Sequence, residues 1–303
     1  MKKLFLSLFG ACFALGANAQ FEWNFRSGEW QLDSMYTVDF ETGERLTTDR
    51  YEYNADGTVA VLYTESWDES ILTDDSPYER YKTVFTYDAG RLAKAESFFE
   101  KGGSWVIETS EEMSDYDANG NPCTIIYYEA DEDDEGQLLP AAKWVVTKWG
   151  SREPADYEHY QPDFGSWDLY RTVVSELDDK GLVTKQTNTA VLFGTSYVST
   201  TTYEYDDHGY PTKEVNTSEY GSSEDTYVNI YDADGNIQTV TTFYNGKEDE
   251  TTYYFWSNGG KTAINGMKLL KADGQWFDLG GRRLNGQPTR KGIFIQNGKK
   301  VVR

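Results

Sequence analysis

Few side chains in this sequence have the types and spacing that enzymatic catalysis needs. The chain has two histidines, His159 and His208, and neither lies near a pattern that would make it the base for a serine or for Cys123. Cys123 precedes the run Thr124–Tyr127, a setting more typical of core packing than of a nucleophile. Residues 20–260 hold 49 acidic side chains, and so many always include some pair at a separation suited to glycoside hydrolysis. We predict no catalytic residues, with an exported, glycan-active hydrolase as the alternative.

Two acidic stretches have the residue types of a cation site. Glu129–Gly136 carries six acidic residues in eight, and carboxylate oxygens are the ligands that calcium prefers. The alternating spacing of a calcium loop is missing, so a solvated loop is the preferred interpretation and calcium the alternative. In Asp232–Asn236 no glutamate closes the loop at the required distance, which indicates a turn. We predict no metal and no cofactor.

Aromatic side chains offer a binding chemistry instead. The stretches Thr226–Tyr231 and Thr251–Trp256 carry apolar groups on both faces of a strand, and flat rings on a rigid sheet suit contact with carbohydrate or protein. The candidate binding residues are Tyr227, Tyr231, Tyr253 and Trp256. The alternative is that tyrosine and threonine pairs only stabilise the sheet across strands. Asp163–Trp167 is interpreted as a loop with an aromatic anchor.

These residues must be positioned by a unit that recurs along the chain as aromatic-Asp-x-x-Gly-x-apolar. Its clearest copy is Tyr231–Ile237, where Asp232 and Asn236 favour a tight turn and Gly235 supplies a positive φ. The flanking stretches are rich in β-branched and aromatic residues, so the unit predicts a β-hairpin. The turn glycines of the copies are Gly57, Gly90, Gly120, Gly181, Gly209 and Gly235.

The spacing of the copies predicts the fold. One gap of 61 residues between Gly120 and Gly181 indicates a further, degenerate copy. Second turn signals lie midway between the copies, as at Lys101–Ser104 and Asn245–Lys247, and leave strands of about ten residues. We predict an all-β fold, an antiparallel up-and-down meander of hairpins that forms an elongated, twisted or curled sheet, with a small β C-terminal tail.

Charge divides the chain into an acidic body and a basic tail. Residues 20–260 hold 49 acidic and 16 basic residues, whereas 261–303 hold two acidic and ten basic ones. We therefore expect a hairpin repeat domain over 20–260 and a separate segment over 261–303. Because residues 20–260 are strongly acidic, they repel nucleic acid and anionic lipid surfaces, and we expect neither as a partner.

The N-terminus has the pattern of a secretory signal peptide. Residues 1–19 have a basic start, an apolar run too short for an ordinary membrane span, and small residues before Gln20. Lipidation at Cys12 is the alternative. After cleavage we expect no integral membrane span and one cysteine, hence no disulfide.

Two segments with the repeat signature, Phe85–Leu92 and Tyr203–Gly209, resemble the YD repeat of RHS-type surface and toxin proteins. The resemblance covers about residues 50 to 245 and implies a wall of hairpins. Because only about seven hairpins are present, we expect that wall without the large closed shell of the family.

The C-terminal tail resembles the end of the sorting domain of Bacteroidetes type IX secretion substrates. The matching residues are Leu279, Gly281, Arg282, Gly292, Ile293, Asn297, Gly298 and Lys299. The resemblance implies passage through the outer membrane with the secretion machinery as partner, and display or release. The tail is shorter than a full sorting domain, and the alternative is that it caps the repeat sheet.

These observations favour a secreted or outer-membrane-surface binding or adhesion protein without catalytic activity. Its expected partner is a glycan or protein at the cell exterior. The competing hypotheses are an exported hydrolase and a structural surface component.

Overall fold

The computed structural model of this chain describes residues 26–27, 30–67, 78–131, 134, 136–192 and 194–258, and five short strands beyond them. These residues form strands and contain no helix. The chain divides into two compact units, Met1–Phe255 and Trp256–Arg303. The signal peptide expected at residues 1–19 lies outside the described residues.

Sixteen long strands make up the main sheet, and the two-residue strands β1 (Arg26–Ser27) and β18 (Lys261–Thr262) pair with the first and last of them. The long strands are β2 (Trp30–Asp39), β3 (Arg45–Tyr53), β4 (Val59–Trp67), β5 (Tyr78–Asp88), β6 (Arg91–Lys101), β7 (Ser104–Tyr116), β8 (Pro122–Ala130), β9 (Leu138–Trp149), β10 (Pro154–Asp163), β11 (Ser166–Leu177), β12 (Val183–Leu192), β13 (Thr195–Tyr205), β14 (Pro211–Ser218), β15 (Gly221–Tyr231), β16 (Ile237–Tyr244) and β17 (Lys247–Asn258).

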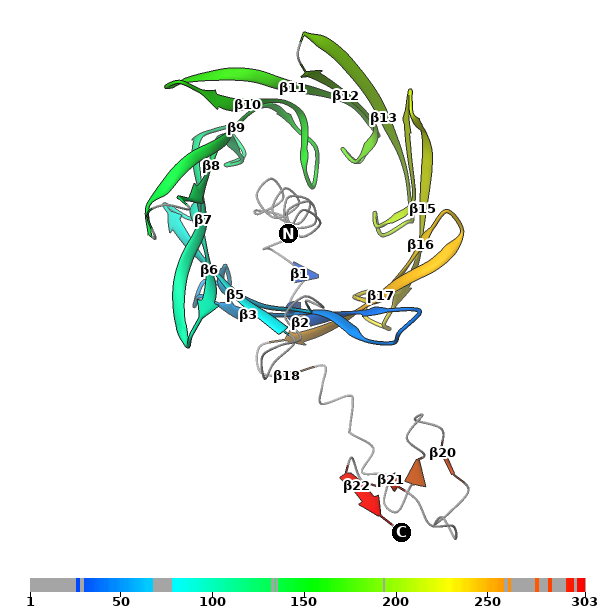
Figure 1. The fold of residues 1–303 in the computed structure, drawn as a ribbon. Coiled ribbons are helices and arrows are strands. Elements are labelled where there is room, and N and C mark those ends of the chain that lie inside the picture. Colours follow the sequence, from blue (N-terminus) through cyan, green and yellow to red (C-terminus); the bar gives the residue numbers. More distant parts are fainter. Residues whose placement is uncertain are drawn as a thin grey trace. The chain divides into compact units, whose positions relative to one another are not determined.

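The main sheet is a closed barrel. Each strand from β2 to β17 pairs with the next, and β17 also pairs with β2, as the ring of strands in Figure 1 shows. At this seam the amide of Phe40 donates to the carbonyl of Asp249 at 2.8 Å. The hydroxyls of Thr37 and Thr252 lie 2.9 Å apart across the same seam. Both contacts join residues more than 200 positions apart, so the two ends of the barrel sequence close the sheet.

The predicted elongated, twisted or curled sheet is therefore wrong. An open sheet leaves two edges whose amides and carbonyls lack partners, and closure removes both edges. The number of hairpins was not the error, because the seven reversals at one end of the sheet match the count of about seven from the sequence. Closure arises from the twist and coil that accumulate over the sixteen strands and bring β17 to β2.

The wall of the barrel has two different faces. Residues paired directly across strands share a face, and the pairs Asp49–Thr64 and Tyr51–Leu62 belong to the same one. Tyr51 and Leu62 are buried, as are Phe85 and other core residues that the strand register places on this face. This is the interior face of the barrel, because the concave side of a closed sheet is the more crowded one.

The reversals between strands alternate between the two ends of the barrel. We call the end with the reversals β3–β4, β5–β6, β7–β8, β9–β10, β11–β12, β13–β14 and β15–β16 the turn end, and the opposite end the loop end. The six repeat glycines all lie at the turn end, with φ between +78° and +87°. The gap between Gly120 and Gly181 holds one more reversal there, in which the amide of Gly150 donates to the carbonyl of Glu153 at 2.8 Å.

Aspartate side chains build the tight turns of the turn end. In Asp232–Gly235 the carboxylate Oδ1 of Asp232 accepts the amides of Asp234 and Asn236, both at 2.9 Å. The amide of Gly235 donates to the carbonyl of Asp232 at 3.2 Å. The positive φ of the glycine lets the chain reverse at this point without a Cβ clash.

In four of the hairpins, the tyrosine before the turn ties its hairpin to the preceding one. The hydroxyl of Tyr205, for example, donates to the carbonyl of Val183 at 2.7 Å, and Val183 is the buried second residue after a turn glycine. The same contact recurs in three further pairs, Tyr53 with Leu32, Tyr87 with Val59, and Tyr116 with Leu92. The turn end is therefore a packed layer in which these tyrosine hydroxyls have partners and apolar residues such as Val59, Leu92 and Val183 are buried.

The C-terminal unit holds a small sheet of its own. Its strand order is β20-β19-β21-β22, with β19 at Trp276–Phe277, β20 at Arg283–Leu284, β21 at Ile293–Gln296 and β22 at Lys299–Val302. Strands β21 and β22 pair antiparallel.

Candidate binding surface

The candidate catalytic side chains lie on separate hairpins. Cys123 is half-buried on β8, with its Sγ 3.9 Å from the carbonyl of Asn121. Burial raises the pKa of its thiol, and the carboxylates of Asp117 and Asp115 raise it further. A thiol held in its protonated form is a poor nucleophile.

Both histidines are packed against aromatic rings. His159 lies on the interior face with 6% of its surface exposed, and its ring stacks on Trp144 at 5.0 Å. Burial lowers the pKa of His159 to about 4, which keeps it neutral at physiological pH. His208 lies in a turn and stacks on Tyr231 at 4.1 Å. Within the described ranges, no hydrogen bond joins either histidine to Cys123.

Burial raises the pKa of two carboxyls, Glu153 in the β9–β10 reversal and Glu214 on β14. Burial raises the pKa of Glu153 to about 7, and the carboxylate of Glu214 adds to the shift. The pKa of Glu214 is itself raised by burial and by Asp225. Glycoside hydrolysis pairs one protonated carboxyl with a second, ionised carboxylate, and the raised pKa of Glu214 works against ionisation of the second group. The hydrolase alternative would therefore use Glu153 and Glu214.

The acidic run Glu129–Gly136 is only partly described, because residues 132, 133 and 135 lie outside the described residues. Among the residues that the structure does describe, no group of three or more His, Cys, Asp or Glu side chains is placed to hold a metal ion.

The four aromatic residues chosen from the sequence do not form one surface. Tyr227 and Tyr231 lie on the interior face of β15, and Tyr231 donates to the carboxylate of Asp206. Tyr253 stacks on Tyr36 at 4.9 Å across the seam. Trp256, three residues further along β17, is buried. Three residues along a strand reverse the face, so Tyr253 and Trp256 point to opposite sides of the sheet.

Exposed apolar side chains gather instead at the loop end. We define the rim as the described residues of the loop-end reversals together with the last four residues of the strand before each reversal and the first four of the strand after it. Of the twelve most exposed large apolar side chains in the described residues, nine belong to the rim. These nine are Phe40, Trp105, Leu139, Phe164, Leu169, Val191, Val198, Tyr220 and Tyr244.

Two of the rim aromatics are presented almost completely to solvent. Phe164 is 107% exposed in the β10–β11 reversal, and its φ of +40° lies in the left-handed region that bulky residues avoid. Tyr220 is 80% exposed in the β14–β15 reversal, and its ring stacks loosely on Tyr197 at 6.5 Å. A large apolar residue held in a costly conformation at an exposed tip points to a role outside the fold.

Sequence reasoning missed the rim because it compared strands with each other and left out the position of each turn. The signal was present in the second turn signals, which lie midway between the repeat turns and therefore at one end of the barrel. Asp163–Trp167 was interpreted as a loop with an aromatic anchor, and Phe164 lies in that segment. The remaining rim residues have no motif of their own, since they share only a position relative to the reversals.

Most of the sorting-like motif lies outside the described residues. Ile293 and Lys299 begin β21 and β22, whereas Leu279, Gly281, Arg282, Gly292, Asn297 and Gly298 are not described. Among the described residues there is no helix with the length and apolarity that a bilayer span requires.

No protein-family model matches this sequence, and no curated protein matches it. Among solved structures, the chain is similar to a porin-like protein from Bacteroides uniformis, with 13% identity, 75% of this chain and 96% of that chain covered, and a TM-score of 0.48. It is also similar to a protein with unknown function from Bacteroides fragilis, with 13% identity, 40% and 88% coverage, and a TM-score of 0.33.

A further similarity is to a chain of a complex described as TcdB2-TccC3-Cdc42. The identity is 14% and the TM-score 0.26, with 80% of this chain but only 15% of that chain covered. Two of these three neighbours are from Bacteroides. Likenesses of this size do not identify a function.

Proposed function

We propose that this chain is a non-enzymatic binding protein of the cell exterior and that the rim is its contact surface for a glycan or a protein. The observation that carries the proposal is the concentration of exposed apolar side chains at one end of the barrel. Apolar groups gathered on one exposed surface mark interaction sites, whereas scattered ones are ordinary. Phe164 and Tyr220 are the anchors, because exposed aromatic rings bury large areas at a small loss of side-chain entropy.

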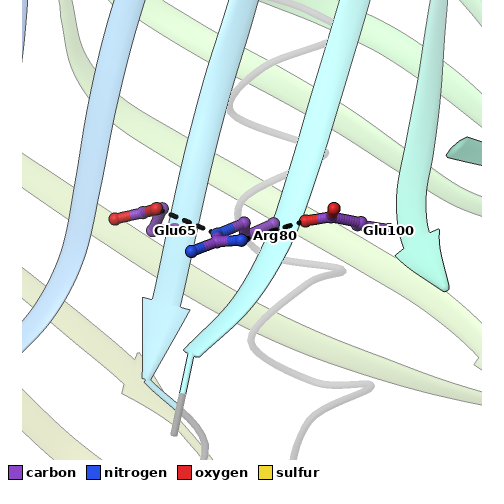
Figure 2. A network of polar contacts seen from close by, with 3 residues as sticks. All are labelled: Glu65, Arg80 and Glu100. Carbon is purple, nitrogen blue, oxygen red and sulfur yellow. Dashed lines mark hydrogen bonds and ion pairs between the residues drawn. The ribbon is translucent and has the colours of Figure 1, made fainter. Parts of the chain in front are cut away.

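The charge on the outer wall supports a barrel that is surrounded by water. Figure 2 shows Arg80 on β5 between Glu65 on β4 and Glu100 on β6, with the Arg80 Nε 3.1 Å from the first carboxylate and Nη1 3.3 Å from the second. In a lipid-facing wall, a cation near the bilayer midplane would cost about 2–4 kcal/mol, and one close to the end of a strand, as Arg80 is, about 0–1 kcal/mol.

Further ion pairs lie on other parts of the same outer face. Lys213 contacts Glu224 at 2.8 Å, and Lys185 contacts Glu176 at 3.0 Å. Lys94 lies 2.9 Å from Glu96, which is in the middle of β6. These charges interrupt the outer face, so it lacks a continuous apolar band tall enough to match a bilayer. Export by the N-terminal signal and the sorting-like tail, both inferred from the sequence, would then place a water-soluble barrel outside the cell.

The proposal is tested by screening the purified chain on glycan and protein arrays beside a rim variant, Phe164→Ser with Tyr220→Ser. We expect bound spots for the wild type and at least a tenfold loss of signal for the rim variant, in line with the removal of two aromatic anchors. The matched control is Val174→Ser with Val228→Ser, which changes two exposed apolar residues of the wall outside the rim. Equal binding by wild type and rim variant, or no binding at all, would contradict the proposal.

The hydrolase alternative rests on the raised pKa of Glu153 beside Glu214. It predicts turnover of an arrayed glycan, with loss of activity in Glu153→Gln and no effect of the rim variant. Release of reducing ends from a bound glycan measures this directly.

A further inference from the structure

The rim combines two properties that together restrict its partner. Nine exposed apolar side chains supply area for desolvation, and the same set of residues holds sixteen acidic but only four basic side chains. Apolar contacts give affinity with little preference for the charge of the partner, whereas the surplus of carboxylates favours a partner with a positive net charge.

Within the rim, the cations are already engaged. Arg80 lies between Glu65 and Glu100, and Lys247 pairs with Glu41 across the seam. The guanidinium of Arg45 lies 4.1 Å from the centroid of the Tyr36 ring. The rim therefore has a surplus of carboxylates, and exposed ones such as Asp163, Asp168 and Glu219 place a negative potential next to the apolar tips.

The anchors lie next to such carboxylates. Asp163 directly precedes Phe164 at the β10–β11 tip, and Asp168 lies just beyond it on β11. Glu219 directly precedes Tyr220 at the β14–β15 tip. A ligand that covers either ring must therefore also approach a carboxylate, which favours a ligand with cations beside its apolar groups.

We propose that the rim docks a cationic polypeptide segment in which Lys or Arg side chains lie next to apolar ones, an inference that rests on the proposed function. A second copy of this chain is disfavoured, because residues 20–260 carry 49 acidic against 16 basic residues and two such bodies repel each other. Acidic glycans are repelled for the same reason. Neutral glycans can donate hydroxyl hydrogen bonds to the carboxylates next to the anchors, but they carry no charge that the surplus of carboxylates attracts.

The test selects binders to the purified full chain from a random peptide library displayed on phage. We expect the enriched sequences to combine Lys or Arg with aromatic or branched apolar residues. We also expect their enrichment to be lost when selection is repeated on the variant Phe164→Ser with Tyr220→Ser. A synthetic peptide of the enriched sequence should bind about tenfold more weakly at an ionic strength of about 0.15 M than at about 0.01 M, since the Debye length falls from about 30 Å to about 8 Å.

Charge-neutral variants separate the rim from the general acidity of the body. Asp163→Asn with Asp168→Asn should weaken the peptide several-fold, whereas Asp179→Asn with Asp207→Asn at the turn end should leave its affinity unchanged. Equal weakening by the two pairs would overturn the proposal, because it would show attraction to the body as a whole. Enrichment of sequences without basic residues would overturn it as well.

The outcomes also distinguish this proposal from the proposed function. Salt-insensitive binding of a neutral glycan that the rim variant loses would retain the rim as a binding surface and overturn its preference for a cationic polypeptide. Concentration-dependent dimerisation through Phe164 and Tyr220 in sedimentation experiments would do the same. Absence of every ligand on the arrays and in the selection would remove both proposals.

Discussion

The two ends of this barrel use hairpin reversals in opposite ways. At the turn end, reversals such as Asp232–Gly235 are closed by their own aspartate and glycine, and apolar residues such as Ile237 two positions after the glycine are buried. At the loop end, the reversals carry exposed rings such as Phe164, whose side chain contributes no burial. Under the proposed function, stability and recognition would therefore lie at different ends of one set of strands.

The difference teaches how a repeat can acquire a binding surface without losing its fold. The repeat signature is concentrated at the turn end, where Tyr205 and its equivalents tie consecutive hairpins together. The loop-end reversals carry no such signature and differ in length and composition. A chain whose hairpins are fixed at one end can vary the tips at the other at small cost, as loops on a rigid scaffold do.

Removing a buried side chain at the turn end should produce the largest effect. Ile237→Ala is expected to cost about 2–5 kcal/mol, the range for truncating a fully buried aliphatic residue. Phe164→Gly at the loop end is expected to cost nothing and to relieve the positive φ of Phe164. Urea denaturation followed by circular dichroism measures both. If Phe164→Gly lowered the free energy of unfolding as much as Ile237→Ala, the two ends would not differ in their contribution to stability.

The stability that the strands between the two ends contribute should change with pH in the direction opposite to that of the turn end. Burial raises the pKa of the interior carboxyl of Glu111 to about 8, above its ordinary 4.5. Between these values the folded state holds a proton that the unfolded state has lost, so this contribution to stability falls as pH rises from about 4.5 to about 8. Burial opposes the shift at Asp206 in the turn end, but the hydrogen bonds from Tyr231 and Tyr210 hold its pKa below its ordinary value. Its contribution is lost only as pH falls below about 4.

The melting temperature measured across this range should therefore be higher near pH 5 than near pH 8. Glu111→Gln should flatten that slope, because an amide has no proton to lose. The conservative control is Glu112→Gln, since Glu112 is the exposed neighbour of Glu111 on β7. An unchanged slope in Glu111→Gln would show that the pH response arises outside the interior wall.

The sequence predicts the turn end better than any other part of the molecule. Asp232, Gly235 and their equivalents act through contacts within five residues, which a single hairpin determines. Closure depends on Thr37 and Thr252, which meet only after sixteen strands have accumulated their twist, so no local pattern encodes it. The rim was missed for the same reason, because its residues share an end of the barrel and no motif.

The smallest expected difference compares one aspartate from each end. Asp232 accepts the amide of Asp234 and both the amide and the side-chain Nδ2 of Asn236, whose side chain is buried. At the loop end, the Asp39 carboxylate accepts the amide and hydroxyl of Thr42 in an exposed turn.

Loss of a buried partner leaves donors without acceptors, whereas water replaces an exposed one, so Asp232→Ala should cost about 1–3 kcal/mol and Asp39→Ala about 0.5 kcal/mol. Urea denaturation of the two variants measures the difference. Asp232→Asn provides a further distinction, because an amide oxygen can still accept hydrogen bonds from the backbone but its charge is lost. If Asp232→Asn retains most of the stability, the turn end is held by the geometry of its hydrogen bonds. If Asp39→Ala proves the more damaging change, the loop end contributes to stability as much as the turn end, and the rim cannot be a region free to vary for recognition.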